Sequence, residues 1–166
     1  MKKSLKRASL LFSTALMLGA QVPTLVSAQE VNPDGFPIVD EPITLSLLAP
    51  GTGMAEWKDM PTLQYYSELT NINFDYTTPP LSDFGTRFNL TFASGDLPDI
   101  IYAPGSDVMT PALEVDYGSQ GLLLPLNDLI ADYAPNLSAI LEDRPDILQS
   151  ITTTDGNIYT LPHINV

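Results

Sequence analysis

The stretch ASGDLPDIIYA, residues 93–103, decides the fold because it converts a helix into a strand. Gly95 stands where a helix ends in the left-handed conformation, and Pro98 prevents that helix from continuing. The residues DIIYA at 99–103 then form a short apolar run that is typical of a buried strand. We therefore expect a helix over residues 84–94 and a strand over residues 99–103.

The segments before this stretch show the same alternation of strand and helix. The apolar, β-favouring run at residues 43–49 ends at a Pro-Gly-Thr-Gly loop, and residues 72–77 alternate apolar and polar side chains. Between them, Pro61 suits the first turn of a helix that ends before Asn71. This order predicts an α/β fold, in which parallel βαβαβ units with right-handed crossovers form a sheet flanked by helices on both faces.

The residues after 103 predict shorter elements. The run GLLLPL at 121–126 indicates a short buried segment, and Asn127 suits the cap of a short helix. Pro135 and Pro145 each suit the first turn of a further helix. Asp155-Gly156 is a hairpin turn signal between two segments rich in Thr, Ile and Tyr.

The N-terminal residues have the pattern of a secretory signal peptide. Residues 1–7 carry four basic side chains, residues 8–20 are an apolar run, and the small tripeptide Val26-Ser27-Ala28 follows. The apolar run is shorter than the roughly 18 residues that a membrane span needs. We expect cleavage after Ala28, a polar linker over residues 29–41, and an extracellular or cell-envelope protein.

The charge and the composition exclude several classes of function. The 166-residue chain has net charge −13 and no cysteine, and without residues 1–28 three basic residues face twenty acidic ones, which gives −17. Such a charge repels nucleic acids and anionic lipids. Without cysteine there are no disulfides and no thiolate metal sites, and the single His163 makes a histidine-based zinc site implausible. We expect no nucleic acid partner, no metal and no cofactor.

Six segments, in their order and spacing, resemble the amino-terminal part of bacterial extracellular solute-binding proteins of family 1, the sugar-binding group that serves ABC importers. They are the strand and PGTG loop at 43–53, WKDMP at 57–61, YYSELTNINF at 65–74, FASGDLPDIIYA at 92–103, QGLLLPLNDLIADYAPN at 120–136 and DGNIYTLP at 155–162.

The resemblance implies a monomeric, two-lobed, hinged protein with the type II periplasmic-binding fold. It would trap a small solute, a sugar, between its lobes and deliver it to a membrane permease. Gln29 stands where many members carry a lipid-modified cysteine, which argues against a lipid anchor. Because family members are much longer, the resemblance also implies that residues 42–166 are the amino-terminal part of lobe one, incomplete and truncated at Val166.

Two aromatic residues are the leading candidates for the binding site. In open α/β sheets, ligands lie beyond the carboxyl ends of the strands, so the loops at residues 50–57 and 102–107 should share one crevice. Sugars need flat aromatic faces and a few well-placed polar groups. Trp57 and Tyr102 meet the first need. The alternatives are that Trp57 covers a helix end and that Tyr102 is an ordinary core residue.

The loops supply the remaining candidates. Thr52, Gly53 and Met54 could bring backbone amides close to a ligand, or they could form a plain connecting turn. Asp83 suits a helix cap better than a ligand contact. Beyond the third strand lies a weaker group of candidates, in which the Asp107 carboxylate would accept hydroxyl hydrogen bonds beside Gly105 and Ser106.

Two other functions stay open beside a non-enzymatic binding component of an ABC importer. One is a secreted carbohydrate hydrolase with paired carboxylates, for which Asp96 and Asp99 are the nearest pair. These two residues are better explained by a helix-end turn and the start of a strand. The other is an extracellular sensor or interaction module. For His163, a structural or lobe-contact role is favoured over catalysis.

Overall fold

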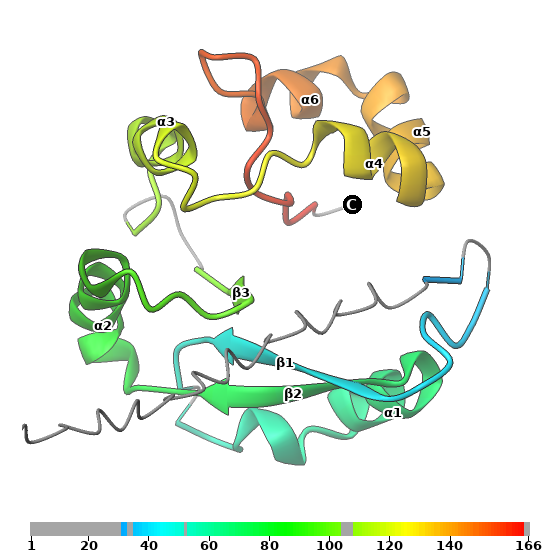
Figure 1. The fold of residues 1–166 in the computed structure, drawn as a ribbon, viewed down its shortest axis with the longest axis vertical. Coiled ribbons are helices and arrows are strands. Elements are labelled where there is room, and N and C mark those ends of the chain that lie inside the picture. The colour runs from blue at the N-terminus through cyan, green and yellow to red at the C-terminus, as the bar shows by residue number, and fades with distance from the viewer. Residues whose placement is uncertain (1–30, 33–34, 52, 104–107, 165–166) are drawn as a thin grey trace, which may run out of the picture.

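The computed structural model describes residues 31–32, 35–51, 53–103 and 108–164 (Figure 1). The predicted signal peptide therefore lies outside the described residues, as do four of the candidate site residues, Thr52, Gly105, Ser106 and Asp107.

The sheet has the predicted parallel arrangement. Its strands β1 (Ile43–Leu48), β2 (Ile72–Thr77) and β3 (Ile100–Ile101) are ordered β2-β1-β3, and both pairs are parallel. The boundaries of β1 and β2 follow the two apolar patterns closely. The structure confirms the α/β class and the βαβαβ order.

Strand β3 is shorter than the predicted residues 99–103, and at its start a side chain replaces part of the ladder. The Asp99 carboxylate accepts hydrogen bonds from the Ser46 backbone N–H at 2.8 Å and from Ser46 Oγ at 2.7 Å. In return, the Asp99 N–H donates to Ser46 Oγ at 2.9 Å. Asp99 is thus joined to β1 mainly through side-chain atoms, and regular pairing begins one residue later.

Two helices form the crossovers between the strands. Helix α1 (Pro61–Thr70) ends at Asn71 with φ 60°, and helix α2 (Leu81–Ser94) ends at Gly95 with φ 72°. The prediction that Asp83 caps α2 is wrong. The cap position is Pro80, Asp83 lies in the first turn, and its carboxylate accepts a hydrogen bond from Ser82 Oγ at 3.0 Å.

The two helices lie against opposite faces of the sheet, as predicted. Leu48 is buried with three α2 side chains, Phe84, Phe88 and Phe92. Phe74 and Tyr76 point to the other face and lie beside α1. No residue of α1 is fully buried, so the α1 face is covered only in part.

The remaining elements are helices. They are η1 (Trp57–Asp59) in the first half and α3 (Pro111–Ser119), α4 (Asn127–Tyr133), α5 (Pro135–Asp143) and α6 (Pro145–Ile151) in the second. Those from α4 onward surround a second small core. Ile130, Leu141 and Ile158 form the core of the second half, which lies above the sheet in Figure 1. The helix starts expected at Pro135 and Pro145 are confirmed. None of the described helices is long and apolar enough to cross a membrane.

Three predictions for the second half need correction. The run at residues 121–126 is irregular rather than a buried segment, and Leu124 is 64% exposed. Asn127 does not cap α4. Instead, its side chain accepts from the Ile158 N–H at 3.0 Å and donates to the Gly156 carbonyl at 3.2 Å. The turn at Asp155-Gly156 forms, but no strands flank it among the described residues.

The described part of the expected linker is bound to the fold. Val39 is only 2% exposed, and its carbonyl accepts a hydrogen bond from Asn71 Nδ2 at 3.0 Å. The Ile38 N–H donates to the Thr70 carbonyl at 3.1 Å. The chain therefore joins the end of α1 before it enters β1.

Candidate functional site

Trp57 and Tyr102 lie side by side. Trp57 opens η1 after the loop that follows β1, and Tyr102 directly follows β3. Their ring centroids are 5.3 Å apart with an interplanar angle of 62°, an edge-to-face contact. The parallel sheet explains this, because the carboxyl ends of neighbouring parallel strands meet at one edge.

The Trp57 indole is held in place on several sides. Its Nε1–H donates to the Pro50 carbonyl at 2.9 Å, and its ring centroid lies 6.3 Å from that of Tyr76. The indole N–H is therefore committed to the protein, and the ring can offer a ligand only its apolar surface. Tyr102 is 49% exposed, so it is not a core residue.

A small cavity of about 210 Å³ borders Trp57. Gly53 turns the loop with φ 74°, a conformation that favours glycine, and Met54 is 96% exposed. The cavity is lined by Gly51, Gly53, Met54, Ala55, Glu56, Trp57 and Thr78. Two of the predicted loop residues, Gly53 and Met54, thus lie next to the aromatic pair.

A larger cavity of about 780 Å³ borders Tyr102. It runs between β3, α3 and the segments at residues 122–126 and 159–163, and most of its walls are apolar. Glu114 is its most buried charged group at 9% exposure, and Thr160 Oγ1 lies 3.3 Å from Glu114 Oε1. Burial raises the pKa of Glu114. His163 also lines this cavity.

The predicted turn at Asp155-Gly156 positions the far wall of this cavity, through side-chain hydrogen bonds that no local sequence pattern indicates. The Asp155 carboxylate accepts from Thr153 Oγ1 at 2.5 Å, from the Asn157 N–H at 3.1 Å and from Tyr159 Oη at 2.9 Å. These bonds, that of Thr153 foremost, hold the pKa of Asp155 at about 2. The Tyr159 ring packs against Gly118 of α3. The chain is thereby fixed just before Thr160 and His163.

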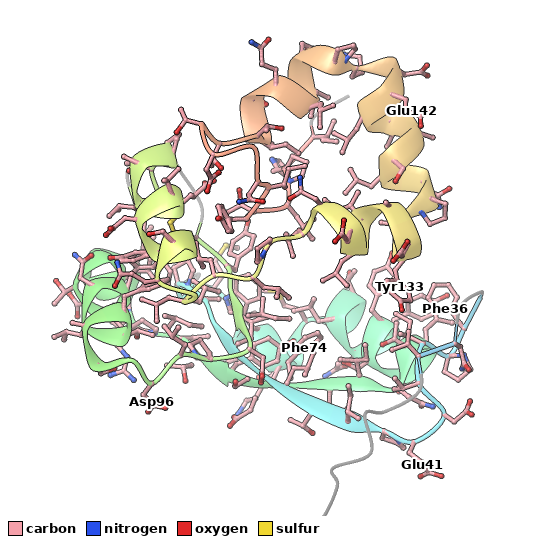
Figure 2. All side chains as sticks on the ribbon, turned by 45° about the horizontal axis from the view of Figure 1, so that its top comes forward. Phe36, Glu41, Phe74, Asp96, Tyr133 and Glu142 are labelled. Carbon is pink, nitrogen blue, oxygen red and sulfur yellow. The ribbon has the colours of Figure 1, made fainter. Side chains whose placement is uncertain are left out.

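Each described acidic candidate either forms hydrogen bonds within the protein or lies away from the two cavities. Asp83 lines neither of these two cavities. The two hydrogen bonds from Ser46 lower the pKa of Asp99, and its Oδ2 atom is committed to them. Asp96 lies in the turn after α2 (Figure 2). Among the described residues, no three His, Asp or Glu side chains are grouped so that they could hold a metal ion.

Comparison with known proteins finds a relative of this chain among ABC transporter substrate-binding proteins. The chain is 39% identical over 103 residues to the fructooligosaccharide ABC transporter substrate-binding protein FusA of Streptococcus pneumoniae. The match covers 61% of this chain and 18% of FusA. No model of a known protein family matches the chain.

Solved structures agree with this relationship. The structure of S. pneumoniae FusA in complex with kestose matches with a TM-score of 0.67 and 31% identity, over 75% of this chain and 25% of that one. The alginate-binding protein AlgQ2 without calcium ion matches with a TM-score of 0.66 and 30% identity, over 76% and 26% of the two chains.

The comparisons confirm the predicted fold, that of part of a periplasmic-binding-protein-like substrate-binding protein. An HMO-binding, ABC-transporter-associated solute-binding protein from Bifidobacterium longum infantis, at 20% identity and a TM-score of 0.54, shares the fold. The chain spans about a quarter of the length of these solved structures and a smaller share of curated FusA. Its relatives FusA and AlgQ2 are sugar-binding proteins.

Proposed function

We propose that the protein is the extracellular solute-binding component of a carbohydrate ABC importer and that it binds an oligosaccharide without converting it. The observation that carries this proposal is the similarity to FusA, at 39% identity over 103 residues. The permease that would receive the sugar is part of the proposal.

The aromatic pair supplies the chemistry that such a ligand needs. A pyranose or furanose ring has an apolar face, which can pack on the surface of the Trp57 indole. The half-exposed Tyr102 adds a second ring surface and a hydroxyl that can donate or accept a hydrogen bond. Gly53 and Met54 would approach the sugar from the loop after β1. The contacts expected from Gly105, Ser106 and Asp107 stay predictions.

Ligand capture would take place in two steps. The sugar first docks on the carboxyl ends of the strands in this lobe, and closure of a second lobe then adds the remaining contacts. The sugar shifts the equilibrium toward the closed state to the extent that it binds that state more tightly than the open one. Delivery to a permease requires no bond cleavage, which is consistent with the structural commitment of Asp99 to Ser46.

Charge favours a neutral ligand over an acidic one. Beyond the predicted signal peptide the protein has twenty acidic residues against three basic ones, which disfavours a polyanionic chain such as alginate. FusA has been solved with kestose and its EF-hand mutant with fructo-nystose, both neutral fructo-oligosaccharides. We therefore propose a neutral oligosaccharide, with fructo-oligosaccharides as the first to test.

The test is calorimetric titration of the secreted protein, purified at its natural length from its own host. Kestose and nystose should bind with saturable heat, whereas an alginate oligosaccharide should bind more weakly. Chromatography of the recovered sugar should show that it is unchanged. Release of shorter sugars would support the hydrolase instead. If a broad panel of oligosaccharides gives no heat, the binding function is wrong.

A further inference from the structure

The aromatic contacts do not stop at Trp57 but continue onto β2. The Tyr76 ring centroid lies 6.3 Å from that of Trp57 and 5.9 Å from that of Phe74. Leu47 of β1 pairs with Tyr76 on β2 and with Ile100 on β3. These three side chains therefore lie on the same face of the sheet, the face against which α1 packs. Tyr102, two residues after Ile100, points to the same face. Tyr76 thus connects the Trp57–Tyr102 pair to the outer strand.

A pocket of about 410 Å³ begins at Tyr76 and extends between α1 and β2. This volume lies within the range of about 300 to 1,000 Å³ that is typical of small-molecule sites. Phe74 of β2 lines this pocket. We call it the α1–β2 pocket; it is lined by Pro42, Lys58, Leu63, Gln64, Ser67, Glu68, Asn71, Asn73, Phe74 and Tyr76.

Several polar groups in this pocket have no partner within the described part of the protein. The Tyr76 hydroxyl, the Lys58 ammonium and the Glu68 carboxylate form no hydrogen bond or ion pair with any described residue. Gln64 uses its amide N–H to bind the Lys58 carbonyl at 3.0 Å, which leaves its side-chain oxygen available. The Tyr76 phenol is protonated at neutral pH and can donate a hydrogen bond, and burial raises its pKa further above the ordinary value.

Aromatic rings surrounded by free donors and acceptors are the chemistry that recognises a sugar unit. We propose that the α1–β2 pocket is a second carbohydrate subsite, which takes a further unit of an oligosaccharide whose first unit lies at Trp57. Tyr76 stands at the junction and contacts both units. This inference rests on the proposed function and adds to it the requirement for a ligand of several units.

The test compares how affinity depends on ligand length in variants of the natural-length protein. Calorimetric titrations with sucrose, kestose and nystose provide a series of increasing length. Tyr76→Phe keeps the ring and removes the hydroxyl, and Glu68→Gln removes one acceptor charge. Tyr65→Phe is the matched control, because Tyr65 lies on α1, is 59% exposed and does not line the pocket.

The wild-type protein should bind the longer sugars more tightly than sucrose. Tyr76→Phe and Glu68→Gln should each weaken nystose about 2- to 10-fold, the effect of one or two hydrogen bonds, and should change sucrose much less. Tyr65→Phe should change neither. If Tyr76→Phe and Tyr65→Phe both bind nystose as the wild type does, the second subsite is wrong while the proposed function stands. If the wild type binds none of these three sugars, the second subsite and the choice of fructo-oligosaccharides as ligand are both overturned.

Discussion

Trp57 and Tyr102 make an edge-to-face contact at 5.3 Å, although α1, β2 and α2 separate them along the chain. The contact exists because both residues follow parallel strands that end at the same edge of the sheet. Each ring restrains the other, and Pro50 restrains the indole further. A ligand that packs on Trp57 therefore meets a surface that is already ordered.

This mutual restraint predicts that Tyr102 supports binding through Trp57. Tyr102→Ala should weaken kestose binding about 2- to 10-fold, because an aromatic pair contributes about 0.5–1.5 kcal/mol. Tyr102→Phe should retain most of the affinity, since the ring contact stays. Calorimetry measures both, with Tyr133→Ala as the control, because Tyr133 lies on α4 and is 61% exposed. Equal affinities for Tyr102→Ala and the wild type would contradict the assignment.

The contact between Gly118 and Tyr159 predicts a stability effect. A methyl group at Gly118 would fall within the Tyr159 ring, so Gly118→Ala must displace a side chain that is only 8% exposed. Overpacking of this kind typically costs about 1–3 kcal/mol. Chemical denaturation should show that loss in the free energy of unfolding.

Gly85 is the matched control, because it is also a helical glycine but has open space around its Cβ position. Gly85→Ala should stabilise the protein by about 0.5–1 kcal/mol, the difference in helix propensity. A stabilising effect of both substitutions would show that Tyr159 is free to move away from α3.

The turn around Asp155 predicts a loss of stability in acid. Its folded-state pKa of about 2 lies below the roughly 3.9 of an ordinary aspartate, so folding favours the ionised form. This contribution is complete above about pH 4 and is lost as the pH falls toward 2. Asp155→Asn should therefore be less stable than the wild type at neutral pH, and the difference should shrink in acid.

Thermal unfolding between pH 2 and pH 7 measures this convergence. Asp96→Asn serves as the control, since the Asp96 carboxylate forms no hydrogen bond with a described residue. The melting temperature of Asp96→Asn should depend on pH in the same way as that of the wild type. A difference between Asp155→Asn and the wild type that stays constant down to pH 2 would contradict the role given to the ionised carboxylate.

The link between Asp99 and Ser46 predicts local rather than catalytic effects. Asp99→Ala removes the acceptor of the Ser46 N–H, so hydrogen exchange at that amide should be faster. Sugar binding should change little, because Asp99 precedes β3 and binds Ser46, whereas Tyr102 follows β3. Asp96→Ala should leave the exchange of Ser46 unchanged. An unaltered Ser46 exchange rate in Asp99→Ala would mean that the carboxylate does not support the sheet.

Local patterns were sufficient to predict the sheet and its crossovers. The apolar run before Pro50 and the alternation at residues 72–77 match β1 and β2, and Asn71 and Gly95 end the helices as such residues commonly do. The proximity of Trp57 and Tyr102 follows from the general geometry of parallel sheets. These features depend on short segments and on one topological rule.

The features that were missed depend on contacts between distant segments. Asn127 resembles a cap, but its side chain binds the turn at residues 156–158, which no local pattern reveals. Tyr76 matched a half-buried strand position, so its contact with Trp57 was not foreseen. Helix α3 was not predicted because it has few regularly spaced apolar residues. The clear sequence signal for its start is Thr110 before Pro111, and in the structure the Thr110 hydroxyl accepts a hydrogen bond from the Leu113 N–H at 3.3 Å.

The most direct test of the central claim uses Trp57 itself, because it is the only tryptophan in the sequence. Its fluorescence is measured while kestose is titrated into the natural-length secreted protein. Packing of a sugar on the indole predicts a saturable change in emission, with the dissociation constant that calorimetry gives. Calorimetric binding of kestose without any change in Trp57 emission would contradict a carbohydrate site built on Trp57 and Tyr102, and no binding of any oligosaccharide in a broad panel would contradict the binding function itself.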